Sequence, residues 1–248
     1  LSVKSSAVKQ TLDSSPNKNH GTIMNGAKYK NGKYGDALDF DDGKSHYVVI
    51  PDSPTLDVRD GITIAVWVKR DSLSGDFPFI MHRAWGDAYD DFWNLGYKCW
   101  VSSDCPVGFS TKTSDSSKTS KIDGDSEPDK GNWVHLAATY DGANITIYRN
   151  GVPQASTPLT GFMPQENNMI TIGAEMNNDG ATPLSFFKGK LDDMYLYNRG
   201  LSVRKEFRLR VTKVMKLTST LARSPKATMV SSNVNPARSW IDFFLTVY

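Results

Sequence analysis

Short segments that alternate apolar and polar residues, each closed by a turn signal, limit this chain most strongly to a β fold. The stretch from Ala37 to Pro51 alternates up to Phe40, passes through Asp-Asp-Gly, and resumes at Tyr47–Ile50. Alternation with a period of two describes a strand with one buried and one solvated face. Asp and Gly favour the turn because Asp bonds its own backbone and Gly accepts positive φ. The two carboxylates of this turn are also oxygen ligands of the kind that calcium needs.

The same pattern continues to about residue 200. In Gly61–Lys69 the four β-branched residues at positions 62, 64, 66 and 68 share one face, and Trp67 and Lys69 lie on the opposite face. Asn-Gly and Asp-Gly pairs mark hairpin turns. The other expected strands are Phe77–His82, Phe92–Tyr97, Asn132–Tyr140, Asn144–Asn150, Asn168–Ala174 and Phe186–Tyr197. With no helix expected before residue 200, the fold class is all-β, an antiparallel two-sheet sandwich or jelly roll.

Charge divides the chain near Leu201. The net charge of the whole is only +2, but residues 201–248 hold nine Lys and Arg against two acids. We therefore predict a domain over residues 1–202 and a basic C-terminal extension over residues 203–248. The chain contains no apolar run of the roughly 20 residues needed to cross a membrane, and no signal peptide opens it.

The extension is expected to form a helix and one strand. Ser202 is a good N-cap, and apolar residues recur at helical spacing at Phe207, Val211, Val214, Leu217 and Leu221. We expect this helix to pack on the domain with a solvated basic face, rather than to bind a membrane or nucleic acid. The alternating end, SWIDFFLTVY, predicts a strand that joins a sheet, because an isolated apolar strand is prone to aggregate.

Three groups of residues are candidates for chemistry. Cys99 and Cys105 are too few for a zinc site; they form either a local disulfide, which we favour, or two free thiols. In the loop from Asp13 to Gly21, Asp13, Asn17 and Asn19 either converge on a cation or form Asx-turns. The aromatic and acidic stretch from Arg83 to Asn94 has the side chains that grip sugars, and its rings alternatively cap the core edge. If this stretch binds a sugar, we expect the sugar to contact Arg83, Trp85, Tyr89 and Trp93.

Five ordered blocks resemble the LamG-like jelly-roll family of the concanavalin A-like lectin/glucanase superfamily. They are ALDFDDG with YVVIP, then GITIAVWVK, GNWVHLAATYDGANITIYRNG, MITIG and FKGKLDDMYLYNRGLS, and the stretch from Asp13 to Gly26 matches a further family segment. The resemblance spans about Asp13 to Ser202 and implies two antiparallel sheets. Many family members bind a structural calcium ion. Carried across, the ligands of that ion are Asp13, Asn17, Asn19, Asp41 and Asp192.

Two departures from the family pattern stand out. The first strand of the family, of the type WxFDE, has no counterpart in LSVKSSAVKQTL, and nothing in the family matches the chain from Val203 onward. We hypothesise that SWIDFFLTVY occupies the sheet position of the missing first strand. Deletion of residues 236–248 should then destabilise the domain severely.

Catalysis is not expected. Glucanases of the superfamily carry two acids in an E-x-D-x-x-E pattern on one strand, and the nearest match, Glu127-Pro-Asp129, lacks the second Glu and contains a proline. We predict a non-catalytic, calcium-stabilised module for carbohydrate binding or adhesion in a secreted or cell-surface protein. Its partner would be a glycan or an extracellular protein. The alternatives are a structural or protein–protein interaction module without glycan binding and, less favoured, a glycoside hydrolase domain.

Overall fold

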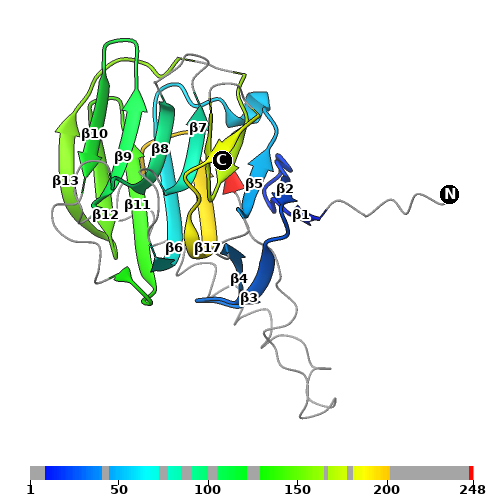
Figure 1. Ribbon diagram of the computed structural model, residues 1–248. Helices are drawn as coiled ribbons and strands as arrows, with labels where there is room; N and C mark the ends of the chain where they lie inside the picture. Colours follow the sequence, from blue (N-terminus) through cyan, green and yellow to red (C-terminus); the bar gives the residue numbers. More distant parts are fainter. Residues whose placement is uncertain are drawn as a thin grey trace, which may run out of the picture.

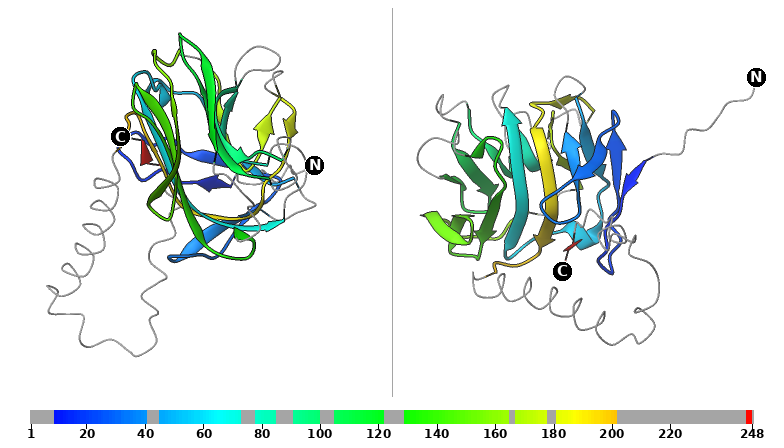
Figure 2. Two further views of the ribbon diagram at one scale, coloured as in Figure 1. Left: turned by 90° about the vertical axis from the view of Figure 1, so that its left-hand side faces the viewer. Right: turned by 90° about the horizontal axis from the view of Figure 1, so that it is seen from below.

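The structure is a computed structural model that describes residues 9–40, 45–72, 78–84, 91–99, 105–121, 129–164, 167–177, 181–201 and 246–247. These residues form two eight-stranded sheets that face each other as layers (Figures 1 and 2). Within each of these two sheets the strands pair antiparallel, with one parallel pairing as the exception. The predicted all-β, two-sheet sandwich is confirmed.

The strand order of each sheet mixes strands from distant parts of the chain. Sheet 1 runs β1 (Gln10–Thr11), β2 (Gly21–Met24), β5 (Tyr47–Ile50), β14 (Ile170–Ile172), β7 (Phe79–Ala84), β8 (Asp91–Tyr97), β9 (Val107–Lys112) and β10 (Ser117–Lys121). Sheet 2 runs β13 (Val152–Pro158), β12 (Asn144–Arg149), β11 (Val134–Tyr140), β6 (Ile62–Ser72), β17 (Lys188–Tyr197), β4 (Asp36–Phe40) and β3 (Lys28–Asn31). A 3₁₀ helix, η1 (Pro54–Leu56), precedes β6, and a small hairpin joins β15 (Glu175–Met176) to β16 (Pro183–Leu184).

The core lies between the two sheets, as the alternation predicts. The apolar face of β6 at positions 62, 64, 66 and 68 is fully buried, and burial of each such side chain stabilises the fold by about 1.5–3 kcal/mol. Phe187 joins the layers, because its ring meets Phe40 edge-on at 6.1 Å and stacks near Tyr97 at 6.4 Å. Trp67, by contrast, lies on the outer face of sheet 2.

Two of the predicted Asn-Gly turns are confirmed. Both residues have positive φ at Asn25-Gly26 (58° and 89°) and at Asn150-Gly151 (51° and 79°), as a type I′ turn requires. Asn150-Gly151 closes the two-residue hairpin between β12 and β13, whereas Asn25-Gly26 connects β2 to β3, which belong to different sheets. The turn at Asn31-Gly32 is longer than two residues, because Asn31 is the last residue of β3 and β4 begins at Asp36. There the turn is closed by the N–H of Gly32, which donates to the carbonyl of Gly35 at 2.8 Å.

The end of the chain returns to sheet 2. β18 (Thr246–Val247) pairs in parallel with Tyr195 and Leu196 of β17, where β4 no longer covers that edge because its pairing stops at Leu191. The expectation that the terminal segment joins a sheet is confirmed for these two residues. The helix predicted from Ser202 to Leu221 lies outside the described residues.

The close approach of β17 to β6 gives a first prediction. Gly189 has φ +140°, and a Cβ there would overlap the carbonyl oxygen of Lys69. Gly151 also has positive φ but meets nothing within 4 Å. We expect Gly189→Ala to lower the free energy of unfolding by about 3 kcal/mol more than Gly151→Ala, which carries only the backbone strain. Urea denaturation measures both variants. Equal losses would show that β17 and β6 have room to separate.

Candidate functional site

Asp13, the first predicted calcium ligand, is buried within its own loop. Its Oδ1 accepts from the N–H of Ser15 at 2.7 Å, and its Oδ2 accepts from the Ser15 hydroxyl at 2.6 Å and the N–H of Asn19 at 2.7 Å. The side-chain oxygen of Asn19 accepts from the Thr55 hydroxyl at 3.0 Å, which ties the loop to η1. Asn17 is exposed. These contacts match the Asx-turn alternative, in which the carboxylate organises the loop.

Asp192, the last-strand candidate, is buried on the outer face of sheet 2. Its Oδ2 accepts from the N–H groups of Lys33 and Tyr34 at 2.7 and 2.9 Å. Burial raises the pKa of this carboxyl group from 3.8 to about 6; the N–H of Tyr34 opposes the shift, and the charge of Asp193 adds to it. Asp192 therefore holds the turn between β3 and β4 in place.

The candidate calcium ligands that the structure describes are engaged in other contacts. No group of three or more His, Cys, Asp or Glu side chains within the described ranges could hold a metal ion. The oxygens of Asp13 and Asp192 already accept backbone N–H groups on separate elements, whereas calcium needs six to eight oxygens in one place. Asp41 lies outside the described residues. Calcium binding stays a prediction that rests on the resemblance.

Two of the predicted sugar contacts point into the core instead. Arg83 on β7 and Trp93 on β8 are neighbours in register, and both are 0% exposed. The Arg83 guanidinium donates to the carbonyl of Leu56 at 2.7 Å and pairs with Asp52 and Asp57 at 2.9 and 3.3 Å. The prediction of ligand contacts through Arg83 and Trp93 is wrong, because both lie within strands whose alternation turns them inward.

Trp85 and Tyr89, the other two predicted sugar contacts, lie outside the described residues. They belong to the connection between β7 and β8. Their role in ligand binding stays a prediction.

The predicted disulfide is confirmed. Cys99 and Cys105 are bonded to each other across the connection between β8 and β9. The N–H of Lys98 donates to the carbonyl of Pro106 at 2.8 Å next to this bond. The disulfide therefore fixes the two strand ends, and it reduces the freedom of the unfolded chain.

An exposed aromatic group lies on the outer face of sheet 2. Trp67 of β6 contacts Tyr34 edge-on at 5.8 Å and His135 of β11 at 5.3 Å between ring centroids. The Lys33 ammonium lies 4.8 Å from the Trp67 ring centre and 5.9 Å from that of Tyr34. We call these four residues the Trp67 cluster. Tyr34 is 59% exposed and Trp67 is half-buried, so the cluster presents ring surface, a cation and a hydroxyl to solvent.

Local geometry sets the position of this cluster. Trp67 is opposite His135 on one side and Asp192 on the other by strand register. The Asp192 carboxylate then fixes the Lys33–Tyr34 turn over the ring. Gly32 permits the approach, because a Cβ there would lie 2.6 Å from Oδ2 of Asp192.

The sequence contained a partial signal for the Trp67 cluster. Alternation in β6 places Trp67 on the solvated face next to Lys69, and an indole on a polar face indicates either contact or binding. Tyr34 lies between glycines 32 and 35 in a tight turn, where a large ring is unusual. The meeting of the two residues depends on the pairing of β3, β4, β17 and β6, which spacing along the chain does not reveal.

The acid that most resembled a catalytic residue has a structural role. Asp129 is buried, and its Oδ2 accepts from the Arg149 guanidinium at 3.0 Å. Glu127 lies outside the described residues. The Asp129 carboxylate therefore ties the segment before β11 to β12.

The chain belongs to the concanavalin A-like lectin/glucanases superfamily. A laminin G-like family model with this description matches residues 42–205, which agrees with the two-sheet sandwich. No curated protein matches the chain. In the described part, no helix is long and apolar enough to cross a membrane.

Solved structures share the fold at low sequence identity. Domain 4 of AbnA, a GH43 extracellular arabinanase from Geobacillus stearothermophilus, was solved with arabinotriose; it is 20% identical with a TM-score of 0.60, covering 79% of this chain and 96% of that one. A botulinum neurotoxin serotype C1 binding domain is 15% identical with a TM-score of 0.56, over 82% of this chain and 51% of that one. A heptameric SAP-like pentraxin from Limulus polyphemus is 16% identical with a TM-score of 0.50, over 75% of this chain and 79% of that one.

The hydrogen bonds of Asp13 give a prediction that also tests the calcium hypothesis. Asp13→Ala leaves buried donors of Ser15 and Asn19 without their acceptor, which costs about 3 kcal/mol in the free energy of unfolding. We expect the same loss with calcium and with EDTA, measured by urea denaturation. A loss that appears only with calcium would show that the carboxylate acts as a metal ligand.

The raised pKa of Asp192 predicts a pH dependence. The folded state binds the proton more tightly than the unfolded chain, so the free energy of unfolding falls as pH rises from about 4 to about 6. Asp192→Asn should flatten this part of the stability curve in EDTA buffers. An unchanged slope in Asp192→Asn would show that the carboxyl group does not titrate in this window.

Proposed function

We propose that this chain is a non-catalytic carbohydrate-binding module and that the Trp67 cluster is its binding surface. The observation that carries the proposal is the exposed Tyr34 ring, set against Trp67 and Lys33 on a rigid sheet. Aromatic faces pack against the apolar C–H faces of sugars, and polar groups beside them bond the hydroxyls. The cluster supplies both, with the phenol hydroxyl of Tyr34 and the ammonium group of Lys33 beside the rings, and the buried His135 supports Trp67 from below.

The similar structures support this class of ligand. The arabinanase domain was solved with arabinotriose, and a botulinum neurotoxin DC binding domain, 12% identical with a TM-score of 0.54, was solved in complex with SialylT. At these identities the likeness extends to the fold alone. Because similar folds were solved with bound glycans, an exposed aromatic patch on this fold is a stronger candidate for a glycan site. The argument for this chain rests on the patch itself.

The module is proposed as a binder because three carboxylates of the described part serve structure. Asp129 pairs with Arg149, Asp13 organises its loop, and Asp192 holds the Lys33–Tyr34 turn. Glycoside hydrolysis needs two carboxyl groups free to flank the bond. The disulfide fits an oxidising compartment, and we place the module outside the cell.

Other parts of the initial hypothesis remain proposals for the same module. Calcium would serve stability, with Asp41 as the ligand of greatest interest. Trp85 and Tyr89 would extend the binding surface from the connection between β7 and β8. The rival function is a structural or protein–protein interaction module, in which the same exposed rings meet a protein.

A glycan array tests the function, and matched variants test the surface. We expect binding to at least one glycan class, reduced about tenfold or more by Tyr34→Ala, equivalent to about 1.4 kcal/mol. Phe162→Ala is the control, because Phe162 is also an exposed ring, 46% accessible and stacked under Arg59, but lies beside the start of β6. We expect Phe162→Ala to bind as the unmodified chain does.

The outcomes separate the hypotheses. No binding on a broad neutral and acidic array would favour the protein-interaction module. Binding lost in Trp85→Ala but retained in Tyr34→Ala would move the site to the connection between β7 and β8. Equal effects of Tyr34→Ala and Phe162→Ala would contradict a localised surface.

A further inference from the structure

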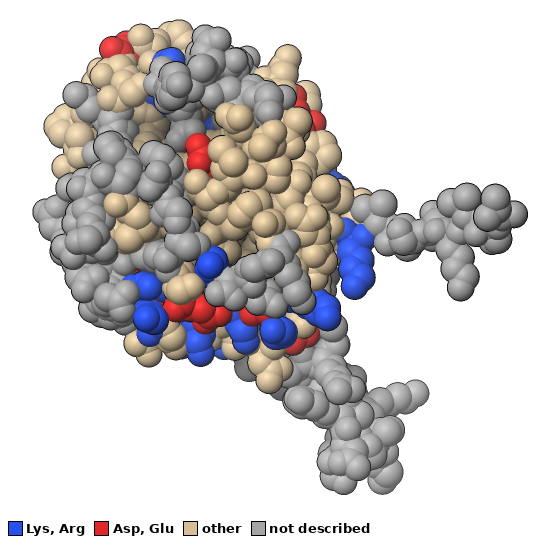
Figure 3. All heavy atoms as spheres, viewed as in Figure 1, with Lys and Arg blue, Asp and Glu red and all other residues tan. Residues whose placement is uncertain are grey.

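Lysines line the strands beside the Trp67 cluster. Strand register sets Lys69 of β6 next to Lys190 of β17, Lys190 next to Asp39 of β4, and Asp39 next to Lys28 of β3. Neighbouring strands are about 4.8 Å apart, so the four side chains form one row on the outer face of sheet 2. We call this set the lysine row. Figure 3 shows Lys and Arg gathered, with acids between them, along the lower edge, where β3, β4 and β17 lie in Figure 1.

The charges of the row are only partly compensated. Asp39 forms an ion pair with Lys30, whose Nζ lies 2.6 Å from the Asp39 Oδ2. The Lys190 ammonium donates to the carbonyl of Asn31 at 3.1 Å, which leaves its charge in place. The side chains of Lys28 and Lys69 make no hydrogen bond or ion pair with another residue of the described part of the chain.

Like charges directly opposite each other destabilise a sheet. Lys69 and Lys190 are such a pair, and a repulsion of this kind costs about 0.2–1 kcal/mol. Six lysines lie on these strand segments and their turn, against five acids: Lys28, Lys30, Lys33, Lys69, Lys188 and Lys190, with Asp36, Asp39, Asp71, Asp192 and Asp193. The surface is therefore net positive. A bound anion would remove the repulsion between Lys69 and Lys190.

The lysine row and the Trp67 cluster form one continuous surface. Trp67 and Lys69 are two residues apart on β6 and so point to the same side. Lys33 lies on the turn that follows β3, the last strand of the row, and its ammonium lies 4.8 Å from the Trp67 ring centre. Ring surface alone suits a neutral sugar. A ring next to a row of ammonium groups suits a sugar that carries negative charge.

We propose that the glycan bound by this chain is acidic, a polysaccharide with carboxylate or sulfate groups, whose rings contact Tyr34 and Trp67 while its anionic groups contact Lys69, Lys190 and Lys28. This inference rests on the proposed carbohydrate-binding function and names its ligand class. Ammonium groups are compact point charges that accept either anion. Both anion chemistries therefore enter the test.

Binding of matched polymers at 0.15 M salt tests the proposal. The probes are dextran, dextran sulfate and polygalacturonate. Their binding to the full chain is measured by affinity electrophoresis and by calorimetry. We expect binding to at least one acidic polymer and none to dextran. Lys69→Gln combined with Lys190→Gln should weaken acidic binding about tenfold and make its salt dependence shallower. Tyr34→Ala should weaken it as well.

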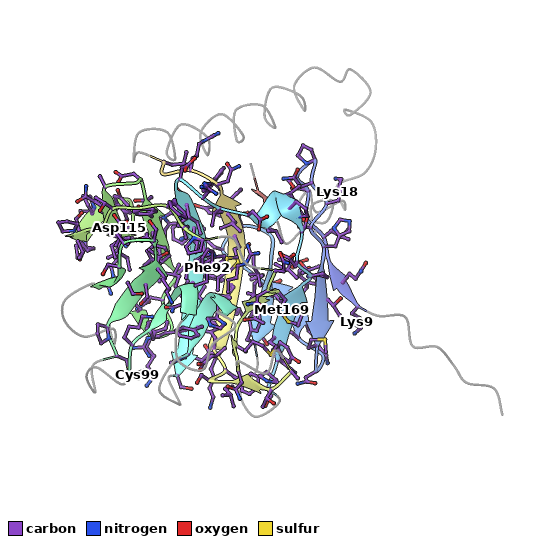
Figure 4. The ribbon with its side chains drawn as sticks, turned by 90° about the horizontal axis from the view of Figure 1, so that it is seen from above. Lys9, Lys18, Phe92, Cys99, Asp115 and Met169 are labelled. Carbon is purple, nitrogen blue, oxygen red and sulfur yellow. A yellow bond between two sulfur atoms is a disulfide. The ribbon has the colours of Figure 1, made fainter. Side chains whose placement is uncertain are left out.

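A charge-matched control identifies the site. Lys9→Gln combined with Lys18→Gln removes the same charge from the N-terminal segment, at one side of the molecule in Figure 4, where both lysines are exposed. We expect this variant to bind normally. Equal weakening by both double variants, or equally tight binding of a DNA oligonucleotide, would show attraction of any polyanion and overturn the inference.

The remaining outcomes separate this inference from the function on which it rests. Binding of neutral glycans, unaffected by Lys69→Gln and Lys190→Gln, would overturn the acidic ligand while the carbohydrate-binding function stands. No binding to any neutral or acidic glycan would overturn both. Normal melting temperatures of the variants exclude unfolding as the cause.

Discussion

The register of β17 against β6 is the constraint on which the fold and the proposed site both depend. Gly189 lets the two backbones approach where any side chain would overlap Lys69. Once this register is set, Asp192 lies opposite Trp67, and Lys190 lies opposite Lys69. The same strand receives β4 on its other edge and, beyond it, the two residues of β18. One pairing thus organises the middle of sheet 2 and its outer surface.

Asp192 links this framework to the exposed surface. The family resemblance gave it the role of a metal ligand, but its carboxylate holds the N–H groups of Lys33 and Tyr34. Two hydrogen bonds to one buried oxygen fix a turn more firmly than a solvent-exposed contact would. The turn then carries an exposed ring and an ammonium group over Trp67. Preorganisation of this kind lowers the entropy lost when a ligand binds.

The sequence predicted the fold well because its signals are local. Alternation identified the inner face of β6, and the positive-φ pairs at Asn25-Gly26 and Asn150-Gly151 matched their turn type. The sequence predicted the disulfide from two nearby cysteines. These features depend on residues within a few positions of each other, where propensity and period act directly.

The site was predicted less well because it depends on register and face. Arg83 and Trp93 were predicted to contact a sugar from the aromatic and acidic composition of their stretch, yet both side chains lie in the core, on β7 and β8. Tyr34, Trp67 and His135 meet only after β4 pairs with β17, β17 with β6, and β6 with β11. The oxygens of Asp13 and Asp192 looked like cation ligands by type, and only their hydrogen bonds show that backbone N–H groups occupy them.

The most direct test of the central claim is an NMR titration of the chain with an oligosaccharide that it binds. Binding at the outer face of sheet 2 predicts that the largest shifts fall on the Trp67 indole N–H and on the amides of Lys33, Tyr34 and Lys190. The amides of β7, β8 and β9 in sheet 1 should change little. The largest shifts on sheet 1, with an unchanged Trp67 indole, would contradict the account.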